Sequence, residues 1–168
     1  MNKTNRTIVY VAMYAALFVL FDRISDMLNI FKMANGGKLN LGPIVLLLSS
    51  YHLGCKNSLS VCLVSVILQF IVGSVTWYGF VSFLLDYLLG YCCYGLASIF
   101  KNYKAFYTGV LLTSIFRLLL STISGTVAFM TPLWASFVYN FSYILPTTIC
   151  AMIMVPILCR MLKPVLEK

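Results

Sequence analysis

The chain has 168 residues, of which 61% are hydrophobic and 10% are charged, and its formal net charge is +8. A soluble domain of this size would leave large apolar patches exposed, so the composition excludes a soluble globular protein and indicates an integral membrane protein. The basic residues are spread over short loops and both tails rather than gathered on one face, which excludes nucleic acid as a partner.

The apolar stretches are continuous rather than alternating, which predicts membrane-spanning helices instead of a barrel. We therefore expect an all-α integral membrane protein with one domain, residues 1–168, folded as a bundle of six transmembrane helices. The predicted helices are Ile8–Phe21, Leu41–Leu53, Ser58–Val72, Phe80–Phe100, Ala105–Ile123 and Leu133–Leu162. Pro43 suits the first turn of the second helix, and Pro146 and Pro156 are expected to kink the last one.

Loops and turns join these predicted helices. The first helix is expected to end in a polar cluster of Asp22, Arg23 and Asp26, or to continue beyond it as an amphipathic turn to Phe31. The loop Lys32–Asn40 follows, because its two adjacent glycines break any helix. The remaining connections are Gly54–Asn57, Gly73–Gly79, Lys101–Lys104 and Gly125–Pro132.

The positive charges predict the orientation in the membrane. An even number of helices puts both termini on one side, and that side collects Lys3, Arg6, Lys56, Lys101, Lys104, Arg160, Lys163 and Lys168. The opposite turns after the third and fifth helices contain no Lys or Arg, and only the region after the first helix dilutes the bias. Cytoplasmic loops are rich in Lys and Arg, so both termini are predicted to be cytoplasmic.

Asp86 is a single acidic residue within the apolar stretch Phe80–Phe100. A carboxylate in hydrocarbon costs about 2.5–3.5 kcal/mol on insertion scales, so it persists where it faces protein or a watery cavity. Asp86 is therefore the first candidate for a ligand site, with Tyr87 and Trp77 as aromatic neighbours. The alternative is an ion pair with Arg117, the only cation well inside a predicted helix, and Arg117 could also anchor the carboxylate when no ligand is bound.

Two further segments could contribute to the site. Gly37 allows close approach of the loop backbone to a ligand, and Asn40 could either touch the ligand or cap the second helix. The second segment holds Trp134, Tyr139, Asn140 and Tyr143, and its paired rings flanking an amide suit a planar heterocycle. The alternative for this segment is an aromatic belt at the membrane interface, with Asn140 bridging helices.

Ala12 and Ala16 lie one turn apart on the first predicted helix and form a small-residue face. Such a face lets another helix approach closely, either within the bundle or on another subunit. Other chemistry is not indicated, because the chain has no phosphate-binding loop, no metal-ligand motif and a single histidine, His52. We expect neither a cofactor nor a metal, and no enzyme activity.

Four segments together carry a resemblance to a known family. They are FKMANGGKLNLGPIVLLLSSYHLG, LLDYLLGYCCYGLASIF, FRLLLSTISGTVAF and YNFSYILP, preceded by the Ala12–Ala16 face. The chain resembles the S component, or substrate-binding subunit, of an energy-coupling-factor (ECF) vitamin transporter, and most of all the thiamine-specific branch. The resemblance covers nearly the whole chain.

This resemblance implies a six-helix subunit of a bacterial cell membrane. Its ligand is implied to be thiamine or a related pyrimidine or thiazole compound, bound near the outer face under the loop after the first helix. Asp86 and Tyr87 match the family's acidic-aromatic pair and Asn140 matches its asparagine, while Ser121 stands where the branch usually has a histidine. The implied partners are membrane lipid, a transmembrane coupling subunit that docks at Ala12 and Ala16, and two cytoplasmic ATPases.

Other functions remain open from the sequence. The chain could be an S component for another vitamin or precursor, or a self-contained small-molecule carrier or channel. Uptake by the chain alone, without ATPase partners, would distinguish a carrier from an S component.

Overall fold

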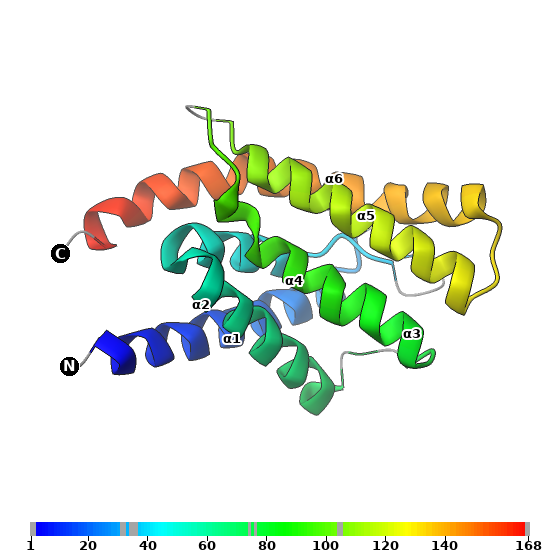
Figure 1. The fold of residues 1–168 in the computed structure, drawn as a ribbon, viewed down its shortest axis with the longest axis horizontal. Coiled ribbons are helices and arrows are strands. Elements are labelled where there is room, and N and C mark those ends of the chain that lie inside the picture. Colours follow the sequence, from blue (N-terminus) through cyan, green and yellow to red (C-terminus); the bar gives the residue numbers. More distant parts are fainter. Residues whose placement is uncertain are drawn as a thin grey trace.

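The computed structural model describes residues 3–30, 33, 37–73, 75, 77–103 and 106–166. In chain order its elements are α1 (Lys3–Leu28), α2 (Gly42–Val72), α3 (Phe80–Ser82), the π-helix η1 (Phe83–Leu89), α4 (Gly90–Gly95), the 3-10 helix η2 (Ala97–Ile99), α5 (Thr108–Ala128) and α6 (Leu133–Leu166) (Figure 1). Within these ranges every regular element is a helix, and the only strand-like pairing is an isolated bridge between Tyr103 and Phe106. The predicted all-α fold is confirmed.

Five helical stretches of the described chain are long and apolar enough to cross a membrane. They are Thr4–Leu28, Gly42–Val72, Phe80–Ile99, Thr108–Ala128 and Leu133–Leu162. Large apolar side chains such as Ile67, Ile115 and Ile153 stay exposed on their outer faces, and lipid is the solvent that suits such a surface. The chain is a multi-pass membrane protein, with five candidate spans where the sequence predicted six helices.

The difference in number comes from α2. The predicted helices Leu41–Leu53 and Ser58–Val72 are the two arms of this single element, and they meet at Gly54, which has non-helical φ of 77° and ψ of 167°. Glycine adopts such a positive φ without steric cost, so the chain can bend there without an intervening loop. The two arms point in clearly different directions in Figure 1.

Several helix ends differ from the sequence prediction. Of the two ends considered for the first helix, the structure has the longer one, because α1 continues past the polar cluster to Leu28. The Asp22 carboxylate is buried there and hydrogen-bonded to the side chains of Asn40 and Gln69. At the other end of the chain, α6 continues through both Pro146 and Pro156 without interruption. The expected loop at Gly125 begins later, because α5 runs on to Ala128.

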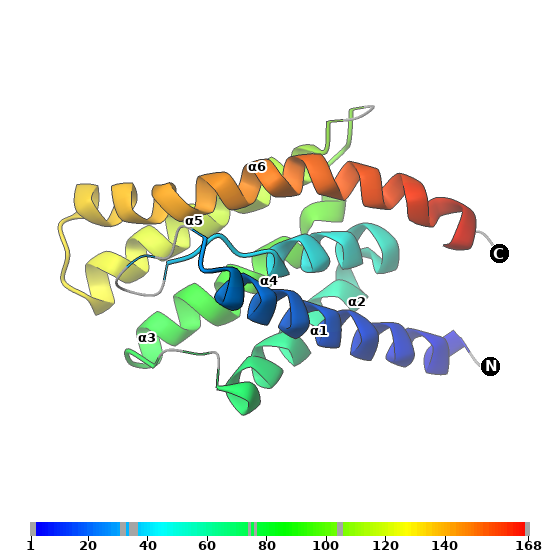
Figure 2. The same cartoon turned by 180° about the vertical axis from the view of Figure 1, so that it is seen from behind.

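The helices run along the long axis of the molecule, and α1 begins at the same end at which α6 terminates (Figures 1 and 2). The apolar core lies between α1, α2, α4 and α6, where Phe18, Leu46 and Tyr94 are fully buried. Phe18 packs edge-to-face on Tyr91, with ring centroids 5.1 Å apart. Towards the opposite end of the bundle, polar side chains and a cavity replace this packing.

Candidate ligand-binding site

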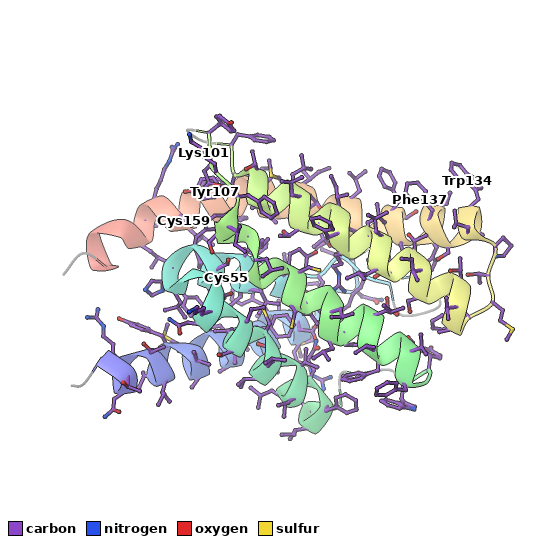
Figure 3. All side chains as sticks on the ribbon, viewed as in Figure 1. Cys55, Lys101, Tyr107, Trp134, Phe137 and Cys159 are labelled. Atoms are coloured by element: carbon purple, nitrogen blue, oxygen red, sulfur yellow. The ribbon has the colours of Figure 1, made fainter. Side chains whose placement is uncertain are left out.

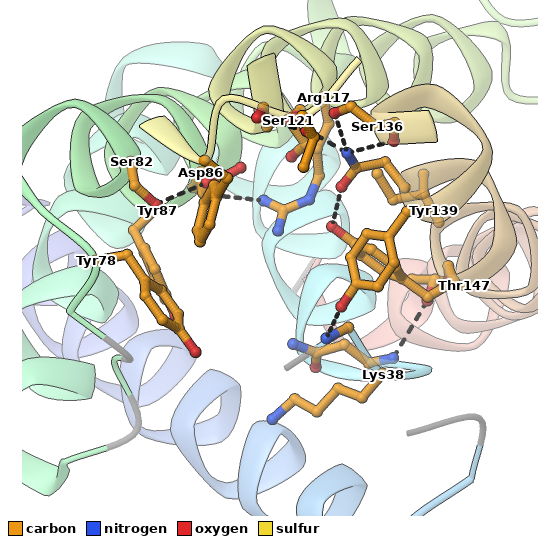
Figure 4. Close-up of a pocket in the computed structure, with 18 of the residues that line it drawn as sticks. Lys38, Tyr78, Ser82, Asp86, Tyr87, Arg117, Ser121, Ser136, Tyr139 and Thr147 are labelled. Atoms are coloured by element: carbon orange, nitrogen blue, oxygen red, sulfur yellow. Dashed lines mark hydrogen bonds between the residues drawn. The ribbon is translucent and has the colours of Figure 1, made fainter. Parts of the chain in front are cut away.

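A cavity of about 340 Å³ lies between residues 37–40, η1, α5 and α6. It is lined by the last turns of α5 and the first turns of α6, which lie at the end of the bundle away from the chain termini (Figures 1 and 4). Small-ligand pockets run from about 300 to 1,000 Å³ and combine apolar walls with a few polar groups. The size and lining therefore suit one small molecule.

Asp86 and Tyr87 lie in η1, whose π-helical turns interrupt the helical stretch Phe80–Ile99. Short π-helical stretches are rare and concentrate at functional sites. The hydroxyl groups of Ser82 and Ser124 both donate to Oδ2 of Asp86, at 3.0 and 2.5 Å. These bonds fix the carboxylate at the cavity wall without neutralising its charge. Among the described residues both ion pairs belong to Lys38, and neither includes Asp86.

Arg117 supports this region without forming the ion pair that was considered from the sequence. Its Nη1 donates to the backbone carbonyl of Asp86 at 3.3 Å, and its guanidinium lies 4.4 Å from the ring centroid of Tyr91 and 5.7 Å from that of Tyr94. Cation–π contacts of this kind stabilise a positive charge away from water. Gly90 makes room for the guanidinium, because a Cβ there would lie 2.9 Å from Nη1.

The amide of Asn140 is fixed between α5 and α6. Its Nδ2 donates to the carbonyls of Ser121 and Ser136 at 3.1 and 2.9 Å, and its Oδ1 accepts a hydrogen bond from the Tyr143 hydroxyl at 2.7 Å. Asn140 therefore bridges helices, as the alternative interpretation of the sequence expected, while it also lines the cavity. Its contacts set the position of the Tyr143 ring.

Two aromatic rings and a loop close another wall. The rings of Tyr139 and Tyr143 meet edge-to-face with centroids 5.8 Å apart. The backbone N–H of Gly37 donates to the Tyr139 hydroxyl at 3.0 Å, and the backbone N–H of Asn40 donates to Oγ1 of Thr147 at 3.2 Å. These bonds seat residues 37–40 against α6 (Figure 4).

Ser121 contributes an unusual hydroxyl to this cavity. The residue is 2% exposed, and its Oγ forms no hydrogen bond with any described residue. A buried hydroxyl without a partner costs free energy, so a ligand group that bonds to it would gain by doing so.

All the predicted ligand-binding residues except the two tryptophans line this one cavity. Trp134 is 72% exposed and stacks on Phe137 at the outer edge of α6 (Figure 3). Trp77 is 57% exposed and stacks on Phe83. Neither indole ring therefore lines the cavity in this structure, because each ring packs on a neighbouring phenylalanine outside it.

Sequence reasoning missed several polar residues that line the cavity, namely Lys38, Ser82, Ser136 and Thr147. Hydroxyl residues in membrane helices also bond to their own backbone, so their type alone gave no signal. Tyr94, which lies on α4 about one helical turn beyond Tyr91, also lines the cavity and was not predicted. No group of three or more His, Cys, Asp or Glu side chains in the described ranges could hold a metal ion.

A multi-pass helical bundle that encloses a largely apolar cavity with a few polar groups, one of them an intramembrane carboxylate, defines a membrane protein that binds or transports small molecules. The family model of the thiamine transporter protein (Thia_YuaJ) matches residues 8–167. The chain belongs to this family, which consists of transporters and not of enzymes. It is also 26% identical over 178 residues to the thiamine transporter ThiT of Bacillus subtilis (strain 168), with 92% of each chain covered.

Proposed function

We propose that the chain is the substrate-binding subunit of an ECF-type importer and that it binds thiamine or a closely related pyrimidine or thiazole compound. The observation that carries the proposal is the Asp86 carboxylate, which lies in the wall of a cavity beside tyrosine rings and forms no ion pair with the described residues. Thiamine offers an exocyclic amine and a cationic thiazolium ring. The family and the Bacillus subtilis relative support the choice of ligand.

In this proposal each part of the cavity has a physical role. Asp86 accepts a hydrogen bond from the ligand's amino group, and a charge-assisted bond of this kind is worth about 1.5–3 kcal/mol. Tyr87, Tyr139 and Tyr143 offer ring faces to the two heterocycles and to the thiazolium charge. The Ser121 hydroxyl can form a hydrogen bond with the edge of the ligand. A side chain with a ring at position 121 would fill the space between α5 and the ligand.

Two residues of the proposed site act mainly by holding other groups of the protein in position. The side chain of Asn140 is engaged with α5, α6 and Tyr143, so its main role is to hold the tyrosine ring in position. Arg117 bonds to the backbone of Asp86, and in the proposal it fixes the η1 turn rather than the ligand itself.

The proposed orientation has both termini in the cytoplasm and the cavity towards the outer face, with the two arms of α2 counted as separate segments. The start of α1 and the end of α6 lie at the same end of the bundle in Figure 1, which supports this topology. The excess of Lys and Arg in the tails and turns assigned to the side of the termini also supports this topology. Labelling of a cysteine added at either terminus from outside intact cells would contradict it.

Ala12 and Ala16 are proposed as the docking face for the transmembrane coupling subunit. Both side chains are exposed, whereas Ala15 between them is fully buried. An exposed pair of small residues one turn apart lets a second helix approach the α1 backbone closely.

Reconstitution tests the transport part of the proposal. Proteoliposomes that contain the chain alone should show no accumulation of labelled thiamine. Accumulation should appear when the coupling subunit, both ATPases and internal ATP are supplied. Uptake by the chain alone would instead support a self-contained carrier.

A further inference from the structure

A buried cluster beside the cavity joins the wall formed by residues 37–40 to α1 and α2. At its centre is Asp22, which is 1% exposed. Its Oδ1 lies 2.9 Å from Nζ of Lys38 and accepts a hydrogen bond from Nδ2 of Asn40 at 2.8 Å. Its Oδ2 accepts a hydrogen bond from Nε2 of Gln69 at 3.1 Å.

Both oxygens of Asp22 are therefore occupied by the protein's own donors. Lys38 and Asn40 line the cavity, whereas Asp22 and Gln69 are not part of its lining. Asp22 consequently acts on the cavity through other side chains. Figure 4 shows Lys38 extended from the loop towards α1.

The charges in this cluster depend on one another. Lys38 also forms an ion pair with Asp26 at 2.8 Å, so two carboxylates hold one ammonium group. The Asp22 side chain is 1% exposed, whereas that of Asp26 is 35% exposed. A buried carboxylate that loses a partner is strongly destabilised, while an exposed ion pair contributes little, so Asp22 should control the position of Lys38 and Asp26 should not.

Asn40 extends the cluster to the start of α2 and to one more helix, α6. While its Nδ2 bonds to Asp22, its Oδ1 accepts a hydrogen bond from the backbone N–H of Gly42 at 2.8 Å, at the start of α2. Its own backbone N–H bonds to Thr147 on α6. Asn40 thus joins α1 and α2 through its side-chain amide, which Asp22 orients, and α6 through its backbone N–H.

We propose that Asp22 is a positioning residue for ligand binding. It does not contact the ligand, but it holds Lys38 and Asn40 so that residues 37–40 remain seated over the cavity, which slows ligand release. This proposal rests on the proposed function only in taking thiamine as the ligand. Its structural part, that Asp22 seats residues 37–40, is independent of any ligand.

The test compares Asp22→Asn with the matched control Asp26→Asn in the full chain in detergent. Hydrogen exchange of the ligand-free proteins is measured first, on peptides that cover residues 37–42. We expect faster exchange there in Asp22→Asn, unchanged exchange in Asp26→Asn, and unchanged exchange in α5 of both variants. Equal exchange of this segment in Asp22→Asn and the parent would overturn the proposal, whatever the chain binds.

Stopped-flow displacement of thiamine then measures the rate of ligand release. We expect release from Asp22→Asn to be about tenfold faster or more, the usual consequence of truncating a buried charge pair, and release from Asp26→Asn to change less than about threefold. If the parent binds no thiamine, the proposed ligand fails while the exchange result still stands. If the parent binds and Asp22→Asn releases thiamine at the parent rate, the positioning role fails.

A double-variant cycle separates positioning from a general loss of stability. In a Lys38→Met background, Asp22→Asn should change the release rate less than it does in the parent, because the cation it positions is gone. An equal effect in both backgrounds would contradict the role assigned to Lys38. If Asp22→Asn does not fold, Asn40→Ala and Lys38→Met replace it, and unchanged exchange and release in both would overturn the proposal.

Discussion

Gly37 has no room for a side chain in the cavity wall. A Cβ at this position would lie 2.7 Å from Cδ1 of Tyr143 and 2.9 Å from the Tyr139 hydroxyl oxygen. We expect Gly37→Ala to push the loop away from α6 and to break the hydrogen bond to Tyr139. Because one such bond is worth about 1 kcal/mol net, thiamine affinity in titration calorimetry should fall by roughly fivefold or more.

The thermal unfolding midpoint of ligand-free Gly37→Ala serves as its control. The loop contributes little to the apolar core, so this midpoint should stay close to that of the parent. Parent affinity in Gly37→Ala would show that residues 37–40 do not contribute to ligand binding.

For Trp134, in contrast to Gly37, we expect a substitution to leave thiamine affinity nearly unchanged. Because its ring is exposed and stacks on Phe137 outside the cavity, we expect Trp134→Phe to change thiamine affinity by less than about twofold, as is usual for surface substitutions. Titration calorimetry checks this directly. A large loss of affinity would mean that α6 rotates or that the ring moves into the cavity when ligand binds.

The residues of the site differ in how far the sequence alone could predict them. Asp86 was predictable because a single carboxylate in an apolar stretch needs a reason to be there. Asp22 has the same chemical group, but it lies in a polar cluster near an expected helix end, where a carboxylate needs no special explanation. Its burial depends on Lys38, Asn40 and Gln69 arriving from two other segments, and one sequence does not reveal such tertiary pairing.

The tryptophans were misplaced for a related reason. Aromatic residues suit both a ligand pocket and a membrane interface, and composition cannot distinguish the two. The direction of Trp134 depends on the rotation of α6. That rotation is set by small-residue contacts with α5, such as the one at Gly125.

At the level of elements, the close approach of α5 and α6 shapes the cavity. A Cβ on Gly125 would lie 2.0 Å from Oγ of Ser136, which is itself bonded to the carbonyl of Thr122 at 2.9 Å. We expect Gly125→Ala to separate the two helices, to displace the amide of Asn140 and to lower thiamine affinity by about tenfold or more, an effect of the size seen when packed helices must shift.

Gly54→Ala is the matched control for this glycine substitution. Gly54 has open space around its Cα but a positive φ of 77°, so alanine there should strain the bend of α2 without touching the cavity. The free energy of unfolding should fall by roughly 1–3 kcal/mol and the unfolding midpoint with it, while thiamine affinity is retained. Equal loss of affinity in both variants would mean that helix stability, not the shape of the cavity, controls binding.

The helices were predicted well where a long, continuous apolar stretch identifies them. The stretches that became α5 and α6 are long and bounded by polar turns, so their existence was clear and only their ends were displaced. The division of α2 was less predictable, since Gly54 could mark either a loop between two helices or a bend within one. The π-helical turn at Asp86 leaves no pattern in the sequence, because its register depends on packing against α5.

For the whole molecule, hydropathy defines a membrane protein and the charge bias predicts an orientation, and neither property needs tertiary information. The cavity does need it, because its walls come from segments more than a hundred residues apart, such as Gly37 and Tyr139. The central claim is that this cavity takes a ligand through the carboxylate of Asp86. Ser82 and Ser124 hold that carboxylate in place, so a conservative change of its charge should leave the bundle intact.

Isothermal titration of the purified chain with thiamine, repeated on Asp86→Asn, tests this claim most directly. We expect saturable binding to the parent and binding to Asp86→Asn that is weaker by about tenfold to a hundredfold, the loss expected for one charge-assisted hydrogen bond. Both proteins should have similar unfolding midpoints without ligand. Equal affinity of the two proteins for thiamine, or no binding to the folded parent, would contradict it.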